Sequence, residues 1–219
     1  MFLTSTTPIR DRVDRQLAAG AAAQLVLLAV LAAGVGLGPL GWLAGTGYAV
    51  GLWTLLAGAA RRAGSTTLGP ADFVTLARAV LVGGVAALVA DRFDTGAVPV
   101  ATLVVIAAVA LALDGVDGQV ARRTRTVSAL GARFDLEVDA FLVLVLSIHV
   151  AVVVTPWALV IGGMRYAFVA ASWVLPWLRG ALPTRFSAKV VAAAAGIVLV
   201  VAAAGVLPTV LAMMPSGTQ

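Results

Sequence analysis

The chain has 219 residues, of which 61% are hydrophobic and 11% charged, and it has no Cys. This composition excludes a disordered chain, a disulfide scaffold, thiol nucleophiles and zinc–thiolate sites. Uncharged stretches of about 20 residues, the length that crosses a bilayer as a helix, predict an all-α integral membrane protein. The net charge of +5 comes from bases in short runs between apolar segments, which favours anionic lipid or a phosphorylated substrate over nucleic acid.

The hydropathy pattern predicts a bundle of about seven transmembrane helices. We expect an N-terminal tail (1–17), a transmembrane hairpin (18–60), a linker rich in Gly, Ser and Thr (61–71), a membrane core (72–213) and a C-terminal tail (214–219). In chain order the spans are 18–36, 40–60, 72–90, 97–113, 136–154, 156–177 and 190–213.

The distribution of bases predicts the orientation in the membrane. Twelve of the fifteen Lys and Arg lie on one side of this arrangement. By the positive-inside rule that side, with the N-terminus and the loop at 114–135, is cytoplasmic, and the C-terminus is outside. The basic tail before the first span also resembles a signal peptide, but the second span follows after a three-residue loop, which favours an uncleaved anchor. We expect a multi-pass protein of the cell membrane.

Five of the ten acids lie within 26 residues, at the facing ends of two consecutive spans. Carboxylates next to hydrocarbon are costly and are therefore functional candidates. Asp114 and Asp117 are three residues apart and Asp135 and Asp139 four apart, so each pair shares one helix face. Antiparallel packing of the two helices would bring the four carboxylates together, while Glu137 points elsewhere.

Such a carboxylate cluster predicts a metal site. Four carboxylates cannot all stay ionised together without cations, and oxygen-only ligands suit Mg²⁺ or Mn²⁺. Two such ions would clamp a phosphoryl group, and Arg122, one turn beyond Gly118, is placed to pair with a phosphate. Gly118 would let a ligand approach the backbone, and Gly115 and Gly131 would let the helices approach each other. In the alternative, the acids cap helices and pair with nearby Arg side chains, which would explain one or two of them.

The segment from 114 to 139 reads D-x2-D-G-x2-A-R-x8-G-x3-D-x3-D and resembles the signature of the CDP-alcohol phosphatidyltransferase family at all eight fixed positions. The resemblance implies a homodimeric transferase of phospholipid biosynthesis that moves a phosphatidyl group from CDP-diacylglycerol to an alcohol and releases CMP. It also implies that the four Asp residues hold two Mg²⁺ or Mn²⁺ ions and that Asp139 is also the general base. Residues of the CDP-donor site would include Gly118, Ala121, Arg122 and Gly131.

A second resemblance to the family lies at the start of the span 72–90. The stretch from Pro70 to Arg78 is similar to the family's P-N-x-x-T-x-x-R opening, with Asp72 in place of Asn. Thr75 and Arg78 would then face the nucleotide or its phosphates. In the alternative, Asp72 caps the helix, Thr75 bonds to its own backbone and Arg78 extends to the headgroups.

Bases elsewhere suggest the acceptor. Arg165 lies near the middle of the span 156–177, which has no acid. Its expected partner is an anionic acceptor such as an inositol phosphate or a glycerol phosphate, or alternatively a carboxylate of the active site. Arg133, Arg185 and Lys189 could add to an acceptor-phosphate site. His149 is interpreted as a hydrogen-bonded packing residue.

Two other functions stay open at this stage. The carboxylates could line a divalent-cation transporter or channel, although they gather at one membrane face. The chain could also be a non-catalytic homologue, because five spans follow residue 72 where the family usually has six. Either the sixth helix is absent, the C-terminus is shortened, or an N-terminal helix takes its place.

Overall fold

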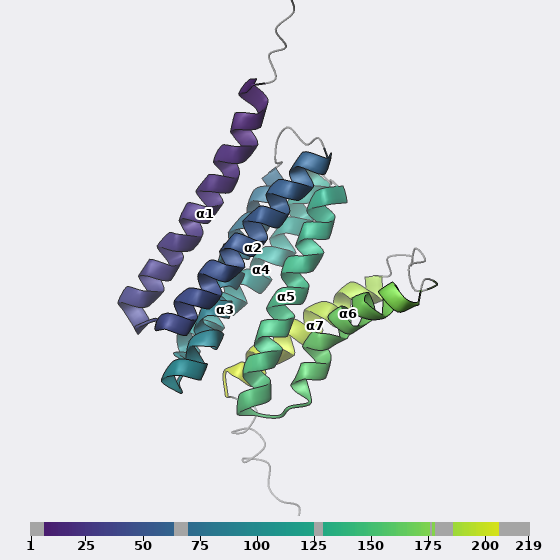
Figure 1. The fold of residues 1–219 in the computed structure, drawn as a ribbon. Helices are drawn as coiled ribbons and strands as arrows, with labels where there is room; N and C mark the ends of the chain where they lie inside the picture. Colours follow the sequence, from purple (N-terminus) through teal and green to yellow (C-terminus); the bar gives the residue numbers. More distant parts are fainter. Residues whose placement is uncertain (1–6, 64–69, 125–128, 176, 178–185, 206–219) are drawn as a thin grey trace, which may run out of the picture.

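The computed structural model describes residues 7–63, 70–124, 129–175, 177 and 186–205, and within these residues the protein is entirely helical and has no strands. Helices α1 to α5 run side by side, and α6 and α7 are inclined to them (Figure 1). The helices are α1 (Thr7–Val35), α2 (Pro39–Ala63), α3 (Pro70–Thr95), α4 (Val100–Thr124), α5 (Ala129–Val153), α6 (Ala158–Val174) and α7 (Phe186–Ala203).

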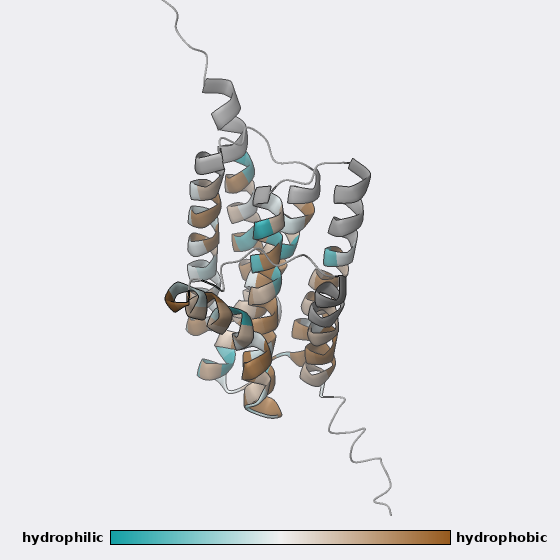
Figure 2. Ribbon diagram, turned by 90° about the vertical axis from the view of Figure 1, so that its right-hand side faces the viewer, coloured by the Kyte–Doolittle hydropathy of each residue, from teal (hydrophilic) through white to brown (hydrophobic). Residues whose placement is uncertain are grey.

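Four of these helices are long and apolar enough to cross a membrane. They contain the stretches Arg15–Val35, Pro39–Ala59, Phe73–Thr95 and Gly131–Val153, and shorter apolar stretches occur at 100–115, 158–174 and 193–203 among the described residues. Hydrophobic residues cover much of the helical surface, with hydrophilic residues gathered in a few places (Figure 2). The prediction of an all-α integral membrane protein is confirmed.

The helices α4 and α5 continue further than the apolar spans indicated. The segment 114–135 was expected to be a loop, but α4 runs to Thr124 and α5 begins at Ala129. This boundary prediction was wrong because hydropathy marks only the part of a helix that lies in hydrocarbon, whereas the backbone hydrogen bonds continue into the polar region. The two acidic pairs lie on these helices, as their spacing predicted. At the other end of the chain α7 ends at Ala203, and residues 206–219 lie outside the described structure.

Helix α3 is the centre of the bundle. In the apolar stretch of α3, 61% of the residues are buried inside the protein, against 17% in that of α1 and 28% in that of α2. It contacts α1, α2, α4 and α5, and the main core contains its residues Ala79, Val82 and Val85 together with Leu103 of α4 and Leu142 of α5. Such close packing, which drives helix association in membranes, fixes the position of any functional side chain on α3.

The connection between α1 and α2 contacts the C-terminal end of α3. Gly36 ends α1 with a φ of 77°, a left-handed conformation that glycine adopts without strain. Two residues later, the backbone N–H of Gly38 donates a 2.7 Å hydrogen bond to Oδ1 of Asp91, which is 6% exposed. This carboxylate lies at the N-terminus of α2, where the helix dipole favours a negative charge.

We expect Asp91→Ala to destabilise the protein by about 2 kcal/mol, because a hydrogen bond to a charged group is lost at a helix N-terminus. The melting temperature of the detergent-purified protein should fall by several degrees. The matched control is Asp94→Ala, which removes an exposed acid from the same helix end. Equal melting temperatures for the two variants would contradict the role assigned to Asp91.

Candidate active site

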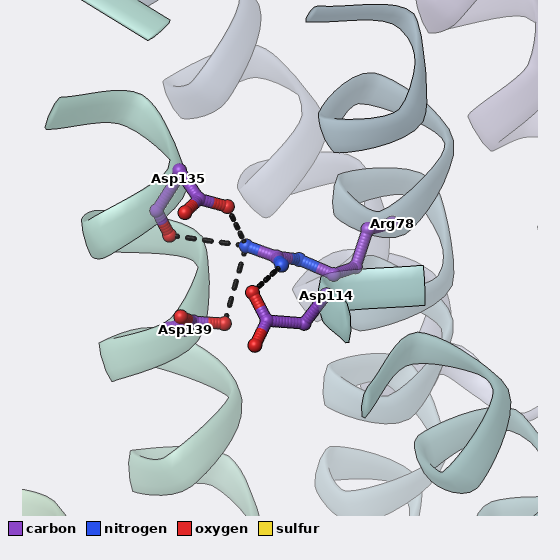
Figure 3. Close-up of polar contacts among 4 residues, drawn as sticks. All are labelled: Arg78, Asp114, Asp135 and Asp139. Atoms are coloured by element: carbon purple, nitrogen blue, oxygen red, sulfur yellow. Dashed lines mark hydrogen bonds and ion pairs between the residues drawn. The ribbon is translucent and has the colours of Figure 1, made fainter. Parts of the chain in front are cut away.

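Arg78 of α3 lies at the centre of a cluster of carboxylates from α4 and α5 (Figure 3). Its Nη1 donates a hydrogen bond to Asp114 of α4, and its Nη2 donates one to the side chain of Asp135 on α5. Nη2 also lies 3.1 Å from Oδ1 of Asp139 and donates a 3.2 Å hydrogen bond to the main-chain oxygen of Asp135. One guanidinium thus connects three helices.

Burial differs sharply between the cation and the anions of this cluster. The Arg78 side chain is 0% exposed, whereas the side chains of Asp114, Asp135 and Asp139 are 36%, 35% and 34% exposed. The guanidinium therefore closes the inner side of the cluster, and the carboxylates remain accessible from the other side. Within the described residues, one guanidinium faces three carboxylates, and such a concentration of carboxylates attracts cations.

The cluster fits a hard divalent cation. One ligand atom each from Asp114, Asp135 and Asp139 can be chosen so that all three lie within 4.8 Å of one another. Carboxylate oxygens are the ligands that Mg²⁺ and Mn²⁺ prefer. Asp117 lies on α4 three residues after Asp114, but its side chain falls outside the described residues.

The three carboxylates come together because α4 and α5 both pack against α3. We expected α4 and α5 to pack against each other, but α3 contacts both of them extensively, and α4 and α5 have few contacts within the described residues. Arg78 fills the space between the two acidic helices, where direct packing would leave three like charges without a counter-ion. The i, i+4 spacing of Asp135 and Asp139 places both on the α5 face that points to this guanidinium.

The residues expected to bind the CDP donor lie on the three helices that carry the cluster, α3, α4 and α5. Thr75 lies one turn before Arg78 on α3 and is 3% exposed, and Gly131 lies in the first turn of α5. The backbone of α4 includes Gly118, Ala121 and Arg122, but their side chains lie outside the description, as does that of Asp72. The alternative in which Arg78 extends to the headgroups was wrong, because its side chain is buried against the three carboxylates.

Arg165 of α6 forms an ion pair with Glu137 of α5. The Arg165 side chain is 30% exposed and that of Glu137 59% exposed. Glu137 is not among the clustered ligands, as expected from its position on another face of α5. The pairing itself was not anticipated, because Glu137 had been assigned to no partner. It places a base of α6 beside the helix that carries Asp135 and Asp139.

The remaining candidates lie on α5, on α7 or outside the described residues. Arg133 is exposed on α5, Arg185 lies outside the described residues, and Lys189 is on α7 with its side chain not described. His149 is 1% exposed and lies next to Ala203 at the end of α7. It follows Asp139 by ten residues, about 15 Å along α5, which agrees with a packing residue. Within the described residues neither ring nitrogen forms a hydrogen bond, so the expected hydrogen bond is not confirmed.

Sequence reasoning missed the pairing of Arg78 with the carboxylates. A signal was present, since an Arg within an apolar span requires an anionic partner at the same depth, and the acids lie at the ends of the next two spans. We assigned that partner to the substrate. The structure pairs Arg78 with the protein's own carboxylates, so its contact with the donor stays a prediction.

Together, the fold and the site define an integral membrane protein with a carboxylate site suited to hard cations. A family model described as CDP-alcohol phosphatidyltransferase matches residues 68–216, and the chain belongs to this family. The family comprises transferases of phospholipid biosynthesis that use CDP-alcohols and typically depend on divalent metals. The match begins just before α3 and leaves the α1–α2 hairpin outside. No curated protein and no solved structure matches the chain.

Proposed function

We propose that the chain transfers the phosphatidyl group of CDP-diacylglycerol to the hydroxyl of a small phosphorylated alcohol and releases CMP. The observation that carries this proposal is the cluster of Asp114, Asp135 and Asp139 around Arg78, contributed by the helices that bear the family signature. The distribution of bases supports a cytoplasmic active site in the cell membrane. A homodimer, which the family resemblance implies, belongs to the same proposal.

The carboxylates have separate tasks in this reaction. Asp114, Asp117, Asp135 and Asp139 would hold two Mg²⁺ or Mn²⁺ ions, which when bound neutralise the diphosphate and the departing CMP. Asp139 accepts the proton of the acceptor hydroxyl, whose oxygen forms a bond to the phosphatidyl phosphorus as the bond from that phosphorus to the CMP oxygen breaks. Its partly exposed side chain is accessible to an acceptor.

The donor site is proposed from the residues next to the carboxylates. Arg122 would pair with a phosphate of the nucleotide, while Gly118 and Ala121, which have little or no side chain, would let the donor approach α4. Thr75 and Gly131 would complete the site from α3 and α5. In this arrangement Arg78 holds the carboxylates in place from the buried side.

A phosphorylated acceptor is favoured by the pair of Arg165 and Glu137. A partly exposed ion pair contributes about 0–1 kcal/mol, so Arg165 can exchange Glu137 for a stronger partner at little cost. A phosphate offers more acceptor oxygens and more charge than a carboxylate. A phosphate bound by Arg165 would lie near α5, the helix that carries the proposed base, Asp139. Arg133, Arg185 and Lys189 would add to the same site.

We expect Arg165→Gln to raise the KM for a phosphorylated acceptor about 10-fold or more, because a charge-assisted hydrogen bond to the phosphate is lost. The KM for CDP-diacylglycerol should stay the same, and initial rates of CMP release at varied acceptor concentration measure both constants. Arg92→Gln is the matched control. It also removes a base, but from the last turn of α3, at the end of that helix away from Arg78 and the carboxylate cluster. An unchanged acceptor KM in Arg165→Gln would exclude this role.

The proposed reaction is tested with a panel of acceptors. The detergent-purified protein is given CDP-diacylglycerol and Mn²⁺ with inositol 1-phosphate, glycerol 3-phosphate, inositol, serine or phosphatidylglycerol, and CMP is measured. We expect release with one of the two phosphorylated alcohols. Preference for an uncharged acceptor would contradict the argument from Arg165. Mn²⁺ uptake into proteoliposomes without nucleotide, together with no CMP release, would instead support the transporter.

A further inference from the structure

The N-terminal hairpin reaches the carboxylate cluster through Tyr48 of α2. The Tyr48 hydroxyl donates a 3.0 Å hydrogen bond to the main-chain oxygen of Ala79, the residue after Arg78. The Tyr48 ring stacks on Phe141 of α5, with ring centroids 5.0 Å apart and an interplanar angle of 26°. Phe141 follows Asp139 by two residues. One side chain thus contacts both the helix that carries the guanidinium and the helix that carries two of its carboxylate partners.

The ring of Tyr48 is held in this position by close packing at Gly83. A Cβ at Gly83 would lie 2.7 Å from Cδ1 of Tyr48 and 2.6 Å from the amide atoms of Gln24, closer than real Cβ atoms come. Gln24 of α1 is 0% exposed. The missing side chain at Gly83, one turn after Ala79, therefore lets both helices of the hairpin approach α3. The tyrosine has little freedom to move away from α3 and α5.

The separation of α3 and α5 determines the shape of the cluster. Arg78 bridges Asp114 on one side and Asp135 and Asp139 on the other, so a shift between α3 and α5 moves the ligand atoms apart. Oxygen ligands of Mg²⁺ need distances near 2.1 Å, and a displacement of about 0.5 Å is enough to weaken such a site.

We propose that Tyr48 is a positioning residue for the metal-binding carboxylates, acting through the spacing of α3 and α5. This inference rests on the proposed function, because it assumes that the cluster holds a divalent cation. It assigns part of the active-site architecture to the hairpin, which lies outside the region matched by the family model.

Binding of Mn²⁺ to the purified full-length protein, followed by electron paramagnetic resonance without nucleotide, tests the inference. We expect Tyr48→Phe, which keeps the ring and removes the hydroxyl, to bind Mn²⁺ about 3- to 10-fold more weakly than the wild type, as expected for one lost hydrogen bond. The melting temperature should fall by at most a few degrees, because the Ala79 oxygen keeps its helical hydrogen bond from Gly83 and is not left unpaired. A purely structural role would lower the melting temperature and leave Mn²⁺ binding unchanged.

The matched control is Thr54→Val on the same helix. The Thr54 hydroxyl donates only within α2, to the main-chain oxygens of Val50 and Gly51 at 2.7 and 2.9 Å. This variant should bind Mn²⁺ like the wild type. Phe141→Leu, which removes the ring partner and keeps the Tyr48 hydroxyl, should weaken Mn²⁺ binding as well and tests the same contact from α5.

The outcomes separate this inference from the proposed reaction. Wild-type affinity in Tyr48→Phe and Phe141→Leu, or equal weakening in Thr54→Val, would overturn the role of Tyr48. A wild-type protein that binds Mn²⁺ but releases no CMP with any acceptor would contradict the reaction, while the comparison of the variants would still decide the role of Tyr48. A wild-type protein that binds no Mn²⁺ would overturn both.

Discussion

Asp139→Asn is expected to lower CMP release from CDP-diacylglycerol at least about 1,000-fold while the protein stays folded. General-base catalysis alone contributes about 100- to 10,000-fold, and this variant also loses a ligand charge from the metal site. The amide is nearly the same size as the carboxylate. Within the described residues, the 3.1 Å contact to Asp139 is the longest ion pair of Arg78, and Arg78 keeps its pairs with Asp114 and Asp135 in this variant.

The control for this prediction is Asp94→Asn. Asp94 is an exposed acid on α3, sixteen residues beyond Arg78 and therefore about 24 Å further along the helix. Chromatographic measurement of CMP and the melting temperature of each variant distinguish lost chemistry from lost folding. If Asp139→Asn kept more than a tenth of the wild-type rate, Asp139 could not be the base.

Arg78→Ala is expected to affect both stability and activity. Removing one partner of a buried ion pair typically costs 3–5 kcal/mol, and we expect about 3 kcal/mol because the three carboxylates are each about one-third exposed. The melting temperature should fall, and CMP release should fall about 100-fold or more as the carboxylates repel one another. Mn²⁺ should raise the melting temperature of this variant more than that of the wild type, because the metal then supplies positive charge in place of the lost guanidinium.

Arg78→Lys distinguishes charge from geometry. A lysine restores the positive charge, but its compact ammonium cannot reproduce the planar fork that bonds to Asp114 and Asp135 together. We expect this variant to recover much of the stability and little of the activity. Thermal denaturation with and without Mn²⁺ measures the stability, and CMP release measures the activity. A melting temperature of Arg78→Ala equal to that of the wild type would show that the ion pairs do not hold the three helices together.

The helical membrane fold and the acidic pairs could be predicted because each depends on local pattern. A long apolar stretch crosses a bilayer as a helix, because its backbone must form its own hydrogen bonds there. The spacing of Asp135 and Asp139 places both on one helix face wherever that helix lies. Hydropathy could not predict the ends of α4 and α5, since the helices continue beyond the hydrocarbon region. The segment 114–135 was therefore expected to be a loop, although the spacing of the acids had already indicated helices at its two ends.

The partners of the charged residues could not be predicted from spacing. Periodicity fixes the faces of one helix relative to each other, but not which neighbour each face meets. Arg78 was therefore assigned to the substrate, while the structure places it between α4 and α5. Arg165 was likewise expected to meet an acceptor or an active-site carboxylate, and it meets Glu137.

The role of the hairpin was also beyond sequence reasoning. Tyr48 belongs to no motif, and its contacts with Ala79 and Phe141 join α2 to both α3 and α5. The resemblance to a known family drew attention to the region after residue 72. The packing of α1 and α2 against α3 shows that the hairpin is continuous with the core around the cluster.

The most direct test of the central claim is the metal dependence of CMP release by the wild-type protein. CMP is measured with CDP-diacylglycerol and each acceptor of the panel, first with Mn²⁺, then after chelation with EDTA, and again after Mn²⁺ is restored. We predict release with a phosphorylated alcohol that stops with EDTA and returns with Mn²⁺. CMP release that continues in EDTA, or no release with any acceptor despite Mn²⁺ binding, would contradict a metal-dependent transferase at this cluster.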